Sequence, residues 1–491
     1  ATTLTVTPTD LGLTAGLLPK DGAVKATANV TDSSGVTTPS EDSAAVNITP
    51  ERIKPVATKT VVEVKDRATG LWKEVPQGTA QGYPEHTFYA GDELRFTTTF
   101  TDNSNYIKKT NVHQGTTGNT IVPNVLDNTF GEANADNISS LTEATSTNPA
   151  KLEVTGKVKD ELQYSDRNAA TRSISAEDAA DNRSDGSTFR IKQGSLAVRN
   201  ANLNPDKKIK VTNLSALTDT EKTSIIEAVK NAHDTATEKE KDRILSVTIE
   251  GNNVKITYKD GQSRTKPISE LAMEVNPPVI GDLSERGGLP DQSITVTNVL
   301  PGATVTLTVA GQTFKKRAEN NANSVTFTAD DLKKVYDANN GLLPSSTSPT
   351  VPNVTATQSV PAGPNTTEEL TSEPSSATIT KETVPPTITY KLQIQNAAGE
   401  WKDAPKEVVR TGKVAGYEIF AGDKYRVIAE VTDNSGKINK LEVSDDRSTQ
   451  TKFIDPRYAT DGEITSISSV TEATERTPAT IEATGTYKPD K

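Results

Sequence analysis

One segment of this chain is spelled twice. Residues 89–109 read YAGDELRFTTTFTDNSNYIKK, and residues 420–440 read FAGDKYRVIAEVTDNSGKINK. The two tryptophans, Trp72 and Trp401, occupy equivalent places about 330 positions apart, and downstream LTEATSTNPAKLEVTGKVK aligns with VTEATERTPATIEATGTYK. Solenoid repeats are far shorter, roughly 20–50 residues. The sequence therefore predicts a multidomain cassette copied in tandem, of which this chain holds about one and a half copies.

Turn signals and strand patterns divide this cassette into modules. Short strands at regular intervals are typical of Ig-like β-sandwiches, so we expect a mainly β, elongated tandem array with one small α+β module. The segment LTVTPTDL near the start resembles VTFTADDL from position 325, which indicates that the chain begins inside a module. The predicted modules are the C-terminal part of an Ig-like module (1–53), an Ig-like β-sandwich (54–198), a small α+β helix-hairpin module (199–276), an Ig-like β-sandwich plus linker (277–385) and a truncated second copy of the 54–198 module (386–491).

Alternating side chains predict a half-buried strand before each shared TDNS turn. Asp and Asn are common turn residues, and Gly436 tolerates a positive φ. We expect each tryptophan to lie near the core of an antiparallel sandwich. The alternation predicts that the buried side chains are Leu94, Phe96, Thr98 and Phe100 in the first copy and Tyr425, Val427, Ala429 and Val431 in the second.

The clearest helix signal is LTDTEKTSIIEAVKNAH, in which Thr218 and Glu221 form a capping box. An apolar face at helical spacing follows this start. Two alternating strands come next, joined by a turn at Gly251 and closed by a turn at Asp260-Gly261. The predicted apolar positions are Ile225, Ala228, Val229 and Ala232 on the helix, then Leu245, Val247 and Ile249, then Val254, Ile256 and Tyr258.

The following module opens at Pro277-Pro278. SITVTNVLPGATVTLTVAGQTFKK predicts two strands around Pro301-Gly302 and a hairpin at Ala310-Gly311, and SVTFTADDL predicts another strand. The stretch 344–386 is rich in Ser, Thr and Pro, and its later part predicts edge strands and a linker.

Composition excludes several classes of function. The 491 residues include no cysteine, three histidines and one methionine, which excludes disulfides, thiol catalysis and Cys-ligated metal sites. A net charge of −11 without a basic face argues against nucleic-acid binding. No apolar run approaches the roughly 18 residues of a membrane span. A cysteine-free chain of this size fits a cytosolic protein or a Gram-positive surface protein, and without a leader or sorting signal we expect a fragment of a longer chain.

A family resemblance favours a Gram-positive surface protein over a cytosolic one. The segments LTDTEKTSIIEAVKNAH and VTIEGNNVKITYKDGQSRTKPI resemble modules of giant Gram-positive surface proteins, and ITVTNVLPGATVTLTV and VTDNSGKI are similar to their Ig-like modules. These segments thus resemble the family of cell-wall-anchored multidomain adhesins of the streptococcal surface-repeat and staphylococcal extracellular-matrix-binding type. The resemblance implies an extracellular, wall-anchored virulence protein that binds fibronectin, plasminogen or other host proteins, or serves as a stalk.

The shared turns raise the question of a metal site. Asp102 with Asn103, and Asp433 with Asn434, place carboxylate and amide oxygens at a module end, where Asp92 and Asp423 of the AGD motif would add further oxygens for Ca²⁺. Turn chemistry alone explains the same residues, and we favour it because no calcium-loop spacing accompanies them. A Lys–Asn isopeptide crosslink is a second possibility, which intact mass would test by the loss of ammonia.

No catalytic motif or cofactor signature is recognisable, so we predict a non-enzyme without a cofactor. His86, His113 and His233 occur in contexts that indicate surface positions, with His233 suited to a helix C-terminus. The charged run TEKEKDR at 237–243 predicts a solvated connector. The basic patch Lys207-Lys208-Ile209-Lys210 is either a solvated strand, which we favour, or a site for plasminogen or acidic glycans.

The function that follows is a host-ligand adhesin, whose ligand-binding residues the sequence leaves unknown. Its alternative is a purely structural stalk, in which repetition serves length rather than recognition. Proline-containing junctions at 276–278 and 384–386 suit a monomeric array of semi-rigid modules. A host matrix or plasma protein is the expected partner, with no nucleic acid and no membrane span.

Overall fold

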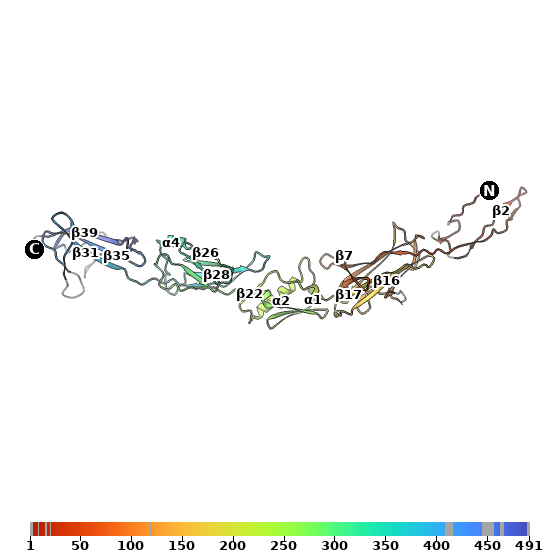
Figure 1. Cartoon of the computed structure of the whole chain (residues 1–491), viewed down its shortest axis with the longest axis horizontal. Helices are drawn as coiled ribbons and strands as arrows, with labels where there is room; N and C mark the ends of the chain where they lie inside the picture. The colour runs from red at the N-terminus through yellow and green to blue at the C-terminus, as the bar shows by residue number, and fades with distance from the viewer. Residues whose placement is uncertain are drawn as a thin grey trace. The chain divides into compact units, whose positions relative to one another are not determined.

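The computed structural model describes residues 3–488 apart from 8, 15–16, 20, 117–119, 408–415, 444–455 and 462–465. Two compact units divide the chain, Ala1–Met273 and Glu274–Lys491 (Figure 1). Strands dominate both units and form many separate sheets, with a few short helices. The predicted mainly β fold class of sandwich modules with a small α+β module is confirmed.

The described part of the first 53 residues includes two small antiparallel pairs of exposed strands. β1 pairs with β4, and β2 pairs with β3. Because their side chains are exposed, hydrogen bonds rather than a core hold these pairs together. Their bounds are Ala23–Val24, Asn29–Thr31, Thr37–Pro39 and Val46–Asn47 for β1 to β4.

Two sheets then pack into a sandwich. One has the order β13-β15-β10-β6-β7, with β5 also on β10, and the other has the order β12-β11-β16-β17-β9-β8, with β14 on β11. The pairing of β17 with β9 is parallel, so the expected purely antiparallel arrangement was wrong at this pair. The strand bounds are Val56–Ala57, Val61–Lys65, Trp72–Glu74, Gln77–Ala80, Tyr83–Phe88, Glu93–Thr101, Tyr106–Gln114, Thr120–Ile121, Gly131–Glu132, Thr142–Glu143, Ala150–Val158, Ala169–Asp178 and Ser187–Gln193 for β5 to β17.

The sandwich core follows the predicted strand parity. Leu94, Phe96, Thr98 and Phe100 on β10 are all buried, whereas the intervening side chains are half-buried. Trp72 was expected near this core, and that expectation was wrong. It lies half-buried on the edge strand β7, where the Arg95 guanidinium carbon lies 4.8 Å from its ring centroid. The cation stacks on the aromatic face and covers it from solvent.

The α+β part of the first unit packs one long helix on a three-stranded sheet of order β19-β20-β21. The Thr218 hydroxyl caps α2 by accepting from Glu221 N–H, and the Glu221 carboxylate accepts from Thr218 N–H, as the capping box predicted. The bounds are Leu196–Arg199 (α1), Ile209–Val211 (β18), Asp219–Ala232 (α2), Lys241–Arg243 (η2, a 3₁₀ turn), Ile244–Glu250 (β19), Asn253–Tyr258 (β20), Ser263–Pro267 (β21), Ile268–Leu271 (α3) and Ala272–Glu274 (β22).

Leu245 is the exception to the predicted alternation in this module. Its side chain is 61% exposed, while Val254, Ile256 and Tyr258 on the neighbouring strand are buried as expected. The register of β19 against β20 shifts between Ile244 and Ser246. A bulge of one residue reverses the side-chain direction locally, which turns Leu245 outward.

In the second unit, two sheets have the orders β23-β24-β27 and β26-β25-β28-β29, with β30 also on β28. Strands β29 and β30, in the later part of the stretch 344–386, each pair with β28 alone among the described strands, which confirms the predicted edge strands, whereas β28 itself lies inside the sheet. Its buried side chains Val354, Ala356 and Gln358 explain this central place. The bounds are Val279–Ile280, Ile294–Thr297, Thr304–Val309, Gln312–Arg317, Ser324–Phe327, Val354–Pro361, Glu369–Thr371 and Ser375–Ala377 for β23 to β30, and Lys333–Asp337 for α4.

The second copy rebuilds one sheet of the first. Its order β32-β31-β35-β39-β37 matches β7-β6-β10-β15-β13, and Arg426 covers the half-buried Trp401 at 4.9 Å as Arg95 covers Trp72. The same local sequence thus reproduces the same aromatic–cation pair. The bounds are Thr387–Gln395, Trp401–Asp403, Lys406–Glu407, Gly416–Tyr417, Lys424–Thr432, Lys437–Ile438, Ala459–Asp461, Thr471–Glu472 and Ala479–Tyr487 for β31 to β39.

Candidate functional site

A buried arginine lies in the middle of strand β16. Arg172 shares its parity with Ala170, Ile174 and Ala176, which belong to the sandwich core, and its residue is only 3% exposed. Burial lowers the pKa of its guanidinium, since desolvation disfavours the charged form. A cation in this position needs an anionic or hydrogen-bonding partner to offset its lost hydration.

The protein supplies only part of that partnership. Nη1 of Arg172 donates to the Thr171 carbonyl at 3.2 Å, and Nη2 lies 3.9 Å from Oδ2 of Asp127. Nε has no hydrogen-bond partner among the described residues. Asp127 accepts from the hydroxyl and the N–H of Thr129, and these hydrogen bonds hold the pKa of its carboxyl below the usual value. Arg172 therefore retains donors suited to an external anion.

The outer face of the same sheet carries a polar cluster and a cleft. Nε2 of His113 lies 2.9 Å from the Ser175 hydroxyl and 2.8 Å from Nη2 of Arg183. Beside it lies a cleft of about 520 Å³, whose mixed charges and polar walls suit a hydrated ligand more than an apolar one. The lining includes Arg52, Lys54, Ser173, Asp181, Arg183 and Gly186.

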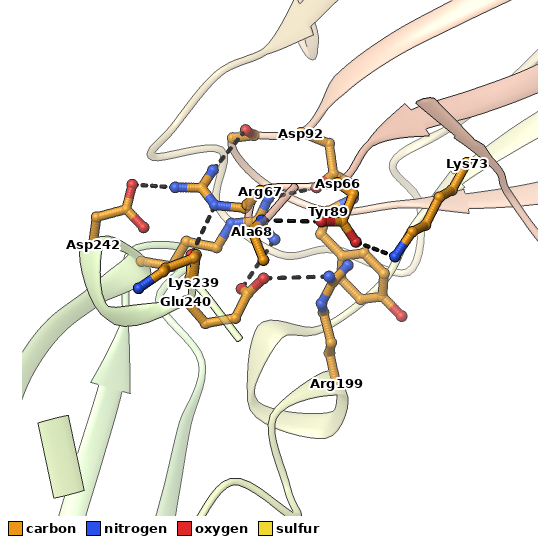
Figure 2. A network of polar contacts seen from close by, with 12 residues as sticks. Asp66, Arg67, Ala68, Lys73, Tyr89, Asp92, Arg199, Lys239, Glu240 and Asp242 are labelled. Atoms are coloured by element: carbon orange, nitrogen blue, oxygen red, sulfur yellow. Dashed lines mark hydrogen bonds and ion pairs between the residues drawn. The ribbon is translucent and has the colours of Figure 1, made fainter. Parts of the chain in front are cut away.

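A buried ionic network joins the sandwich to the α+β part within the first unit (Figure 2). Nη2 of Arg243 lies 2.5 Å from Oδ1 of Asp92, and both residues are 3% exposed. Nη1 of Arg243 lies 3.3 Å from Glu240, which also pairs with Arg199 at 3.2 Å. Although burial alone would lower it, attraction to Asp92 and Glu240 raises the pKa of Arg243. The opposite charges thus offset one another across this junction, although Nε and Nη1 of Arg243 and Oε2 of Glu240 have no hydrogen-bond partner among the described residues.

Further contacts surround this network. The Arg199 guanidinium lies over the Tyr89 ring at 4.8 Å, and Arg67 pairs with Asp242 and donates to the Lys239 carbonyl at 2.9 Å. A cleft of about 710 Å³ opens beside the junction, and its lining includes both basic and acidic side chains. The exposed basic and acidic side chains of this lining offset one another, so the cleft has no strong preference for a ligand of one sign of charge.

The aspartates considered for calcium make turn contacts instead. Oδ2 of Asp102 accepts from the N–H and hydroxyl of Ser104, and Oδ1 of Asp433 makes the same contacts with Ser435. Asp92 is engaged by Arg243. Within the described ranges, no group of three or more His, Asp or Glu residues could hold a metal ion. These contacts favour turn chemistry, while the isopeptide crosslink stays a prediction.

The predicted surface positions of the histidines were wrong. His86, His113 and His233 are all buried. His233 does end α2, but its Nδ1 lies 2.8 Å from the Val229 carbonyl and its Nε2 lies 3.0 Å from the Tyr258 hydroxyl. Strand pairing and helix packing, which the local sequence does not reveal, enclose all three rings.

We expect the first unit to lose stability as the pH falls from about 7.5 to 5. Burial lowers the pKa of His86, His113 and His233. Below the ordinary histidine pKa of about 6.5, the unfolded chain therefore binds protons that the folded chain does not, and acid favours unfolding. Urea unfolding at several pH values measures this loss. The variant His113→Gln should weaken the pH dependence in this window, whereas a flat profile of the parent chain would contradict the expectation.

Acidic groups change the stability of the first unit at a lower pH than the histidines do. Backbone hydrogen bonds from Thr218 and Thr212 lower the pKa of Glu221 to about 2. A carboxyl with a lowered folded pKa contributes stability that is lost only as the pH falls below its unfolded value of roughly 4.3. The two kinds of group are therefore separable by their pH ranges.

The charged run 237–243 was wrongly predicted to be fully solvated. Glu240 and Arg243 are buried in the network described above. In the basic patch, Lys208 donates to the Ser269 carbonyl at 2.8 Å, and Ile209 belongs to β18. Sequence reasoning also missed Arg172, although its core-facing parity on a strand was an available signal.

Comparison with known proteins adds two domain matches. Residues 78–197 match the GspA/SrpA SigLec-like domain family, and residues 200–273 match the atypical Rib domain family. These matches support a Gram-positive surface adhesin. The resemblance to Gram-positive surface adhesins, which the α+β and Ig-like segments predicted, is confirmed. The described helices include none that is long and apolar enough to cross a membrane.

Solved structures give further similarities. The SrpA adhesin from Streptococcus sanguinis is 28% identical over 46% of this chain and 96% of its own, with a TM-score of 0.33. The sialic acid binding region of the Streptococcus sanguinis SK1 adhesin, solved bound to 3'sLn, is 17% identical over 78% of this chain and 97% of its own, with a TM-score of 0.35. A search of curated proteins found no match.

Proposed function

We propose that this chain binds sialylated glycans of host glycoproteins through its SigLec-like region, and that Arg172 pairs with the carboxylate of the sugar. The observation that carries the proposal is the buried guanidinium of Arg172. Among the described residues its Nε has no hydrogen-bond partner, and its one ion-pair neighbour, Asp127, lies 3.9 Å away. The region that holds this residue is the one that matches the SigLec-like family.

The chemistry of the pair supports a carboxylate ligand. A planar guanidinium offers parallel N–H donors that match the two oxygens of a carboxylate, and burial strengthens such a pair. Sialic acid is a carboxylate-bearing sugar, and it is the sugar that the similar region of the Streptococcus sanguinis SK1 adhesin binds. A neutral sugar would leave the cation uncompensated, so binding should depend on the acid. Binding without bond cleavage also agrees with the absence of a recognisable catalytic motif in the sequence.

The test measures binding of 3'sLn and of its desialylated counterpart to the full chain by isothermal calorimetry. Loss of one partner of a buried charge pair weakens binding by about 2–5 kcal/mol, so Arg172→Gln should reduce affinity at least about 30-fold. The matched control is Arg190→Gln on the adjacent strand β17, whose guanidinium pairs with Glu85 at 2.7 Å. Equal binding of both glycans, or unchanged affinity of a folded Arg172→Gln variant, would contradict the proposal.

Two earlier hypotheses remain distinguishable in the same assays. Recognition of a fibronectin- or plasminogen-like protein through peptide contacts predicts that desialylation of the host protein leaves binding intact. A structural stalk predicts no saturable binding of glycan or protein. Location on the cell surface agrees with the adhesin class, and anchoring to the wall stays a prediction.

A further inference from the structure

The two copies of the AGD motif have the same loop geometry. The Asp92 carboxylate accepts from Tyr89 N–H at 2.8 Å, and the Asp423 carboxylate accepts from Phe420 N–H at 2.8 Å. The aspartate N–H donates back to the aromatic residue's carbonyl at 3.0 Å in both loops. Each glycine has a positive φ and donates to the end of the neighbouring strand. The loop is therefore preformed in both copies.

The first of these loops is covered by the α+β part of its unit. Ala90 is fully buried in the same core as Leu196 and Tyr258, and Gly91 is buried beside it. A Cβ on Gly91 would lie 3.0 Å from Oδ1 of Asp160. Asp92 gives its other carboxylate oxygen to Arg243. The loop thus serves as one wall of the α+β core.

The second loop presents the same groups to solvent. Phe420 is 64% exposed, and Ala421 and Gly422 are exposed as well. The carboxylate of Asp423 is half-buried and receives only the backbone hydrogen bond from Phe420 in the described part of the chain. An exposed aromatic ring beside an alanine and a carboxylate matches, position by position, the surface that is buried in the first copy.

We infer that the loop Phe420–Asp423 is a docking surface for an α+β module of the kind formed by residues 200–273. The arginine of that module equivalent to Arg243 pairs with Asp423, and its core covers Ala421. The occupant follows from the first copy, where a module of this kind covers the equivalent loop. The Phe420 ring offers the same aromatic face to a cation as Tyr89 offers to Arg199.

Single cysteines give a direct test, because the chain contains none. The parent chain is compared with an extended chain in which residues 489–491 are replaced by a second copy of residues 160–273. Ala421→Cys reports on the loop in both chains by its rate of maleimide labelling. We expect labelling in the extended chain to be at least about tenfold slower, because burial limits the reaction to transiently open states. Ala90→Cys in the parent gives the rate of a covered loop, and Ile388→Cys, on the exposed part of β31, should be fast in both chains.

Charge changes show whether the ion pair carries the docking. Arg243→Glu in the appended copy alone should restore fast labelling at position 421. Asp423→Arg should do the same, and Asp423→Arg combined with Arg243→Asp in the appended copy should slow the labelling again. Fast labelling at position 421 in the extended chain, while Ala90→Cys in that chain stays slow, would overturn the inference. Failure of the appended module to fold would count equally against it, because the loop is expected to complete that module's core.

Discussion

Replacing Arg243 by methionine should lower the free energy of unfolding of the first unit by about 3–5 kcal/mol. Methionine keeps an unbranched apolar stem and removes the charge, so Asp92 and Glu240 stay buried without their cation. Each uncompensated carboxylate then favours the unfolded state, in which water solvates it. Most of this loss is the cost of leaving two buried carboxylates without a cation, and only a small part is the net stabilisation that their ion pairs with Arg243 contribute.

Two further variants separate this cause from others. Arg67→Met removes a cation from the same junction, but its partner Asp242 is largely exposed, so the loss should stay below about 1 kcal/mol. The triple variant Arg243→Met, Asp92→Leu, Glu240→Met removes all three charges and should recover most of the stability that Arg243→Met loses. Urea unfolding measured by circular dichroism gives these values. Equal losses for Arg243→Met and Arg67→Met would show that the buried network does not hold the junction.

Local sequence was sufficient for the elements whose signals are themselves local. The capping box at Thr218 and the apolar spacing of Ile225 and Val229 define α2 without help from distant residues. Alternation likewise predicted which side of β10 and β35 is buried. In each case, the hydrogen bonds and periodicity lie within one element. The repeat then carried these assignments from one copy to the other.

Burial of charges depended on partners far away in the sequence. Arg243 contacts Asp92 across 151 positions, and nothing in TEKEKDR distinguishes it from a solvated run. The histidines were misplaced for the same reason, since neighbouring strands rather than adjacent residues enclose them. Arg172 is an intermediate case. The alternation along β16 predicts that its side chain faces the core, but nothing in the local sequence predicts that its Nε has no hydrogen-bond partner among the described residues. The candidate binding group was therefore predictable as a buried cation, but not as an unsatisfied one.

The second large effect concerns the sandwich core. Phe96→Ala should lower the free energy of unfolding of the first unit by about 3–5 kcal/mol. Phe96 is fully buried between the sheets, and its ring lies 5.8 Å from that of Phe189 on the opposite sheet. Truncation removes this contact and leaves a cavity that closely packed strands cannot fill.

The equivalent position in the second copy provides an internal control. Val427 occupies the same place on β35 and is 8% exposed, so Val427→Ala removes two carbon atoms instead of a phenyl ring, and from a less enclosed site. Its loss should be about 1–2 kcal/mol and should affect the second unit. Calorimetry of the full chain measures both effects. The thermal transition that each variant shifts is assigned to the unit that carries the substitution. Equal losses at the two positions would mean that the second sheet adds little to the packing of Phe96. A larger loss at Phe96 is the expected outcome, because a whole ring that packs against Phe189 of the opposing sheet is removed there.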